Sequence, residues 1–133
     1  MARILLIDDD DAVRSMLQKM LTISGHTVTV ASNGKEGMAL APETNADLLI
    51  TDLVMPEMEG YEVLMALRKK HRKLKIIAIS GGGRFSADDY LKTAKFLGAD
   101  RILAKPFSHE ELITTINELM AESGDSAPPA SSG

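Results

Sequence analysis

The sequence predicts an α/β fold with a doubly wound, five-stranded parallel sheet and helices on both faces. Five short runs of apolar or β-branched residues are each followed by a segment with helical periodicity, so strand and helix alternate along the chain. Such alternation is typical of parallel sheets, because each helix returns the chain through a right-handed crossover. The third run, at 48–50, is entirely apolar, which is typical of a central strand buried on both faces.

The first half of the chain contains three strand–helix pairs, with strands expected at 4–7, 27–31 and 47–52. The first helix has an apolar stripe from Val13 to Leu21, and Gly25 is expected just beyond its end. Asn33 and Glu36 form a capping-box pair for a second helix that is expected to end near Pro42. The third helix is expected at about 60–71, with a basic last turn at 68–70 that complements the helix dipole.

The second half contains the remaining two pairs. A strand at 76–79 ends at Ser80 and three glycines, and a helix is expected at 86–97, before Gly98. The fifth strand, at 102–104, leads to Lys105, and a capping-box pair at positions 108 and 111 begins the last helix. Residues 1–122 are therefore expected to form one domain, and residues 123–133, which include no large apolar side chain, a disordered tail or linker stub.

Composition narrows the class of protein. A chain of 133 residues with 44% hydrophobic and 26% charged residues is typical of one globular domain. The net charge of −4 argues against direct binding to nucleic acid or to an anionic membrane. Without cysteine there is no disulfide and no thiol nucleophile. No apolar run is long enough to span a membrane and no signal peptide precedes the first strand, so a cytoplasmic location is expected.

Polar side chains follow four of the five expected strands. Asp8 and Asp9 follow the first, Asp52 the third, Ser80 the fourth and Lys105 the fifth. The carboxyl ends of parallel strands meet at one edge of the sheet, where ligands bind in such folds. Three carboxylates together suit Mg²⁺, while a hydroxyl and an ammonium suit the oxygens of a phosphoryl group. The chemistry indicated is phosphoryl transfer to a carboxylate.

With these motifs in this order, the chain resembles the receiver domain of two-component response regulators, of the chemotaxis type. The motifs are residues 6–9, Asp52 with the Met-Pro pair at 55–56 and Gly60, then Ser80, then the Lys-Pro-Phe run at 105–107, and the resemblance covers about residues 3–121. It implies a flavodoxin-like sheet with strand order 2-1-3-4-5.

The resemblance also implies a role for each matching residue. Asp52 would be the phosphoacceptor, and the Mg²⁺ ligands would be Asp8 or Asp9, Asp52 and the backbone carbonyl of Val54. Ser80 would be the switch hydroxyl, and Lys105, before a cis peptide bond to Pro106, would pair with the phosphoryl group.

The implied partner is a sensor histidine kinase or a histidine phosphotransfer domain that donates from a phosphohistidine. The chain would catalyse only its own phosphotransfer and dephosphorylation, and so is expected to be a signalling domain and not an enzyme. Its output domain or protein would bind the surface formed by the fourth helix, fifth strand and fifth helix. One departure concerns the switch: Ile102 stands where the family usually has Tyr or Phe, so no aromatic relay from Ser80 is expected.

Other interpretations of these residues remain. The aspartates at 8–11 are also consistent with helix capping or with complementing the helix dipole, Asp11 above all. His26, His71 and His109 have no metal-ligand spacing and are expected to be solvated. One alternative function is a Mg²⁺-dependent phosphohydrolase with an aspartyl-phosphate intermediate, although such enzymes usually have a second Asp where Val54 stands, and a cap domain. Another is a phosphate-free scaffold domain with the same fold.

Overall fold

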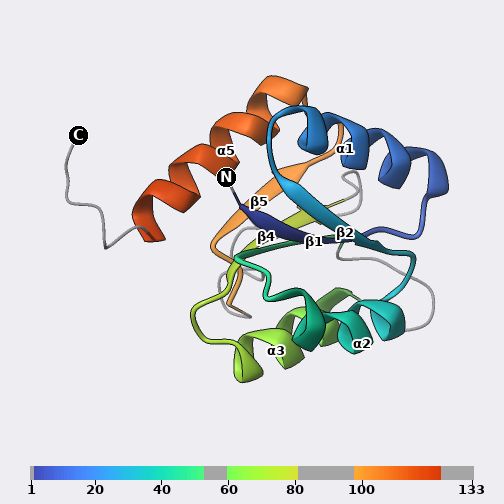
Figure 1. Ribbon diagram of the computed structural model, residues 1–133, viewed down its shortest axis with the longest axis vertical. Helices are drawn as coiled ribbons and strands as arrows, with labels where there is room; N and C mark the ends of the chain where they lie inside the picture. The colour runs from blue at the N-terminus through green and yellow to red at the C-terminus, as the bar shows by residue number, and fades with distance from the viewer. Residues whose placement is uncertain (1, 53–59, 81–97, 124–133) are drawn as a thin grey trace.

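Five parallel strands form a single sheet in the computed structural model, which describes residues 2–52, 60–80 and 98–123 (Figure 1). The strands are β1 (Arg3–Ile7), β2 (Thr27–Ala31), β3 (Leu48–Asp52), β4 (Lys75–Ser80) and β5 (Arg101–Ala104). Their spatial order is β2-β1-β3-β4-β5, and all four pairings are parallel. The predicted fold and strand order are confirmed, and each strand lies within one residue of its expected ends.

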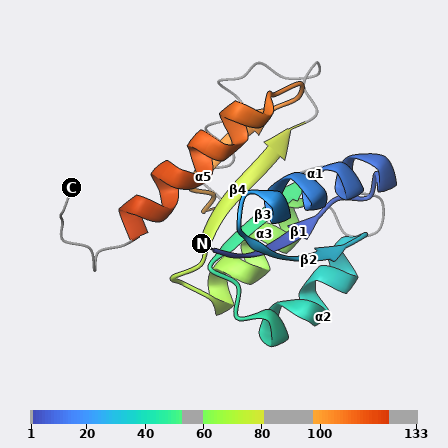
Figure 2. The ribbon, with the colours of Figure 1, turned by 45° about the horizontal axis from the view of Figure 1, so that its top comes forward.

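Helices cover both faces of this sheet. In Figure 1, α1 (Asp11–Ile23) and α5 (His109–Ser123) lie on one face, and α2 (Gly34–Thr44) and α3 (Gly60–Lys70) lie on the other. Figure 2 turns the face with α1 and α5 toward the viewer. The helix expected at 86–97 and most of the expected tail lie outside the described residues. No helix within the described ranges is long and apolar enough to cross a membrane.

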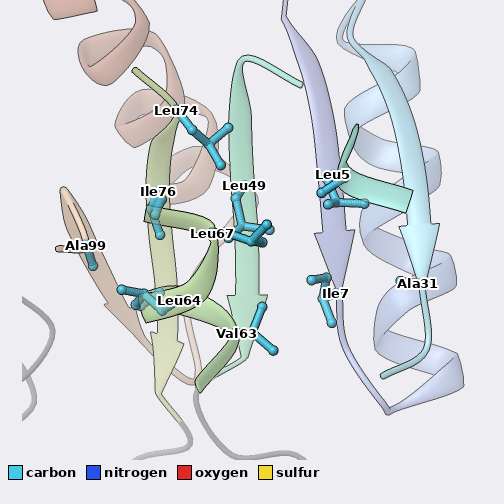
Figure 3. Packing of buried hydrophobic residues seen from close by; sticks show 12 residues of the cluster. Leu5, Ile7, Ala31, Leu49, Val63, Leu64, Leu67, Leu74, Ile76 and Ala99 are labelled. Atoms are coloured by element: carbon cyan, nitrogen blue, oxygen red, sulfur yellow. The ribbon is translucent and has the colours of Figure 1, made fainter. Parts of the chain in front are cut away.

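Alternation along each strand divides the core into two layers. Leu5, Ile7 and Leu49 face α2 and α3, where they pack with Val63 and other buried residues (Figure 3). Their neighbours along the same strands (Ile4, Leu6, Leu48 and Ile50) pack against α1 and α5. All five residues of β3 are buried. Since burial of one large aliphatic side chain stabilises a fold by about 1.5–3 kcal/mol, β3 is held firmly from both faces.

The start of α1 differs slightly from expectation, and its end agrees with it. Asp10, and not Asp11, caps the helix, because its side chain accepts a hydrogen bond of 3.1 Å from the backbone N–H of Val13. Asp11 is the first helical residue, where its charge complements the helix dipole and pairs with Arg14. Gly25 follows the helix with φ of 101°, a positive value that glycine adopts easily because it has no Cβ.

α2 is longer than predicted. Asn33 caps it as expected, but the Glu36 carboxylate accepts hydrogen bonds from the N–H and hydroxyl of Ser32 and not from Asn33. These bonds lower the pKa of Glu36. The predicted end near Pro42 is wrong, because the helix continues to residue 44 and ends where Asn45 adopts φ of 50°. A proline fits the helical φ, and so close to the end of the helix it removes a single hydrogen bond.

The start of α5 agrees with expectation, whereas the environment of His26 does not. Ser108 and Glu111 form the full capping box of α5, with reciprocal bonds of 3.0 and 2.9 Å. His26 is not solvated as expected: it is half-buried, and its Nδ1 accepts a hydrogen bond of 3.1 Å from the N–H of Ala2. Burial is the main reason why the pKa of His26 is lowered, and the nearby N-terminal charge adds to it.

Candidate metal-binding site

The register of the sheet brings the predicted acidic residues together. Ile7 of β1 pairs with Thr51 of β3, so Asp8 and Asp52, the next residue of each chain segment, emerge side by side at the carboxyl edge. Single oxygens of Asp8, Asp9 and Asp52 all lie within 4.8 Å of one another. Asp8 is 0% and Asp52 7% exposed, whereas Asp9 is exposed. Three carboxylates at this spacing can serve as ligands of one metal ion.

Asp8 is the most deeply buried member of this cluster. Its Oδ1 accepts a hydrogen bond of 2.9 Å from the N–H of Asp10, but its Oδ2 is buried and has no hydrogen-bond partner in the described structure. Burial raises the pKa of Asp8; the Asp10 hydrogen bond and Lys105 act against this, and the charges of Asp52 and Asp9 reinforce it. A buried carboxylate oxygen without a hydrogen bond is unfavourable unless a cation offsets it, so the site fits a metal ion.

Lys105 approaches the cluster from the end of β5. Its Nζ lies 3.5 Å from Asp52 Oδ2 and 3.8 Å from Asp8 Oδ2. The Lys105–Pro106 peptide bond is cis, as expected, and Phe107 packs half-buried against the core under α1 and α5. When all are ionised, one ammonium and three carboxylates leave two formal negative charges. A divalent cation would balance that excess, and its preference for oxygen donors matches the carboxylates present.

The other predicted site residues are Ser80, Ile102 and Val54. Ser80 is the last residue of β4 and pairs in register with Ala104, so its backbone reaches the same edge as Asp52. Ile102 lies on β5 and is half-buried, packed against the core cluster under α2 and α3. Val54 lies outside the described residues.

One residue of the site was missed by sequence reasoning. The Arg14 guanidinium donates a hydrogen bond of 2.8 Å to the backbone carbonyl of Asp8, and it also pairs with Asp11. It therefore fixes the loop between β1 and α1, on which Asp8 and Asp9 lie. The only feature of the sequence that could have indicated this role is the position of Arg14 in the first turn of the helix, three residues after Asp11, where the two side chains can meet.

Comparison with known proteins decides the family. The family model for the response regulator receiver domain matches residues 4–117. The chain belongs to this family. As a receiver domain it is a signalling domain, and its function lies in phosphorelay signal transduction. The predicted function is confirmed at that level, and the family match favours it over the phosphohydrolase alternative.

Curated relatives of this receiver domain include regulators and a kinase. It is 34% identical to the transcriptional regulatory protein PrrA of Mycobacterium leprae, over 97% of the chain and 54% of the relative. It is 36% identical to the cell cycle response regulator CtrA of Brucella ovis, over 91% of the chain and 51% of the relative. It is also 36% identical to the sensor kinase CckA of Brucella abortus, over 90% of the chain but 12% of the relative. The chain thus spans about half or less of these proteins.

Solved structures agree with the fold. The chemotaxis response regulator CheY4 of Vibrio cholerae superposes with a TM-score of 0.82 at 30% identity, over 90% of this chain and 98% of that one. A CheY-like receiver domain protein from Methanospirillum hungatei gives a TM-score of 0.87 at 28% identity, over 96% and 99%. Both likenesses span nearly the whole of each structure, so the receiver domain fold accounts for the described part of this chain.

Proposed function

We propose that this receiver domain accepts a phosphoryl group on Asp52 from a phosphohistidine donor, in a Mg²⁺-dependent reaction that changes partner binding. One observation carries the proposal: the Asp52 carboxylate is nearly buried between two further carboxylates and within 3.5 Å of the Lys105 ammonium. A nucleophilic carboxylate, oxygen ligands for a metal and a cation for the phosphoryl oxygens are therefore adjacent. These are the groups that phosphoryl transfer to an aspartate needs.

Each residue would have a separate task. Asp8, Asp9 and Asp52, with the carbonyl of Val54 expected beside them, would hold Mg²⁺. When bound, Mg²⁺ would supply positive charge to the phosphoryl oxygens and oppose the repulsion among the carboxylates. Asp52 would attack phosphorus in line: one carboxylate oxygen forms the new P–O bond, the P–N bond breaks, and the imidazole leaves with a proton taken from solvent. Lys105 would pair with the transferred oxygens.

The proposed output follows from the added charge. A phosphoryl group adds roughly −1.5 to −2 charges, which Ser80 and Lys105 would move to meet. Ile102 stands where the family usually has Tyr or Phe. Any change of its packing on phosphorylation would therefore involve an aliphatic side chain, without an aromatic ring or a hydroxyl. The partners we propose are a sensor histidine kinase or histidine phosphotransfer domain and an output domain or protein. The setting we propose is cytoplasmic, with residues 1–122 as the domain and no substrate beyond its own aspartate.

Intact-mass spectrometry after incubation with acetyl phosphate and Mg²⁺ tests the assignment. We expect the wild type to gain one phosphoryl group, Asp52→Asn none, and Asp47→Asn one. Asp47 is a fair control because it is an exposed aspartate directly before the amino end of β3, the strand that ends with Asp52. Undiminished modification of Asp52→Asn would reject Asp52 as the acceptor. An unmodified wild type, also with a panel of phosphohistidine donors, would favour the phosphate-free scaffold.

A further inference from the structure

A second charged surface lies at the amino edge of the sheet, opposite the acidic site. The stretch from the last turn of α3 to the first residue of β4 reads Arg-Lys-Lys-His-Arg-Lys-Leu-Lys, residues 68 to 75. It holds six of the chain's fifteen lysines and arginines, although the net charge of the chain is −4. We call residues 68–75 the basic turn. Such concentration of one charge on a few residues is a candidate site for an anion.

The backbone of the basic turn is held in place by one of its own residues. The Arg68 guanidinium donates to the carbonyl of Gly98 from Nε at 3.0 Å and to that of Arg72 at 2.8 Å, and it pairs with Asp100 at 2.9 Å. A further bond of 2.8 Å joins the N–H of His71 to the carbonyl of residue 67. Arg68 is thus used for structure, and the turn is ordered before any ligand arrives.

Four of the other five cations of the basic turn have no such use. Lys69, Lys70, Arg72 and Lys73 are exposed, and none of them has an ion-pair partner among the residues that the structure describes. Lys69 and Lys70 lie in the last turn of α3, where they complement the helix dipole. That explanation does not extend to Arg72 and Lys73, which follow the helix. Four like charges close together repel one another, and an anion would relieve that repulsion.

These four cations line a cleft with an apolar component. The cleft has a volume of about 630 Å³ and is lined by Lys69, Lys70, His71, Arg72 and Lys73. Six apolar residues also line it: Leu5, Ala41, Pro42, Ala46, Leu74 and Met120. In Figure 3, Leu74 lies at the amino end of β4 and Leu5 lies midway along β1. The volume lies within the range of small-molecule sites, and the mixture of cations with apolar groups suits a ligand with an anionic end and a less polar body.

We propose that this cleft binds a small molecule that carries at least two linked phosphates on a less polar body, the chemistry of a nucleoside diphosphate. Linked phosphates offer the closely spaced charges that four neighbouring cations can contact together. An extended nucleic acid fits less well, because exposed Asp47 lines the same cleft, and exposed Glu43 directly follows Pro42, another lining residue, in α2. The proposed site is at the opposite edge of the sheet from Asp52 and goes beyond the phosphoacceptor function.

A Mg²⁺-free titration isolates the cleft from the acidic site, where phosphate would be repelled. ADP is added to ¹⁵N-labelled protein in EDTA, and amide shifts are followed by NMR. We expect saturable shifts centred on residues 69–74. Arg72→Gln with Lys73→Gln should weaken binding by about tenfold or more, because two charged contacts are lost. The control, Lys19→Gln with Lys35→Gln, removes two exposed lysines on other helices and should bind like the wild type.

Three results would overturn the proposal. Equal affinity of the wild type and the Arg72/Lys73 double variant would show that the basic turn is not the site. Pyrophosphate binding as tightly as ADP would refute the part assigned to the apolar side chains. The third result is displacement of ADP by phosphatidylglycerol vesicles or by a short DNA duplex. If either competitor displaces ADP at a total phosphate concentration below that at which ADP half-saturates the protein, the surface would be assigned to a membrane or a nucleic acid instead. Each variant's unperturbed spectrum elsewhere checks that it is folded.

Discussion

Replacing Asp52 with Asn should make the metal-free protein more stable. The structure places this carboxylate, 7% exposed, within 4.8 Å of the Asp8 and Asp9 ligand oxygens. Asn has nearly the same size and removes the charge, so the packing around β3 is kept while the repulsion is lost. A site whose charges destabilise the fold is expected where function requires them.

The expected size follows from the distances. At an effective dielectric constant of about 20, each repulsion amounts to at least about 3.5 kcal/mol, because the oxygens lie no more than 4.8 Å apart, and the attraction to Lys105 over 3.5 Å amounts to about 5 kcal/mol. Two repulsions therefore exceed one attraction by at least about 2 kcal/mol. Asp9 is exposed and its contribution is screened, so we expect Asp52→Asn to gain about 1 kcal/mol in free energy of unfolding.

Urea unfolding with EDTA and with MgCl₂ measures this balance. In EDTA the Asn variant should unfold at a higher urea concentration than the wild type. In Mg²⁺ at tenfold above its dissociation constant, the wild type should gain about 1.4 kcal/mol and the variant clearly less, because one ligand is lost. Glu118→Gln, at an exposed position of α5, is the control and should change neither value.

Two results would refute this reasoning. If Asp52→Asn were less stable than the wild type in EDTA, attraction to Lys105 would outweigh the repulsion among the carboxylates. If Mg²⁺ stabilised both proteins equally, Asp52 would not be a ligand.

Four other substitutions test contacts away from this cluster. Gly37→Ala would bring a Cβ to 2.8 Å from Ile7 Cγ1, so urea unfolding should show a loss of about 1 kcal/mol after the gain in helix propensity. Arg68→Ala should lose about 2 kcal/mol in the same assay and Asp100→Asn less, because the Asn oxygen still accepts hydrogen bonds. His26 has a lowered pKa in the fold, so the unfolded state binds more protons below about pH 6.5 and stability should fall there. In His26→Gln that part of the pH dependence of the urea midpoint should vanish.

The sheet and the acidic cluster were predictable because both depend on local pattern. The apolar run of β3 indicates a buried central strand, and a residue directly after such a strand must appear at the carboxyl edge. Asp8, Asp52 and Lys105 could therefore be brought together from the order of strands alone, and the structure finds their charged atoms within 4.8 Å.

What could not be predicted depends on contacts between distant segments or on small differences in energy. Nothing in the sequence near Arg68 indicates that it binds Gly98, thirty positions away. His26 was expected in solvent because its bond to Ala2 exists only once β1 and β2 are paired. The end of α2 was misplaced because the cost of Pro42 near a helix end is small, and neighbouring contacts can outweigh it.

The two edges of the sheet carry opposite charges, and this has a consequence for encounters in solution. Asp8 to Asp11 and Asp52 gather where the strands end, whereas the basic turn lies where β4 begins. These two groups of charge therefore form a dipole directed along the strands. The field of a positively charged surface would turn the acidic edge toward it before contact, which raises the rate of productive collision. Dissolved salt screens that field, so association with such a partner should slow as ionic strength rises, even where the final contacts stay the same.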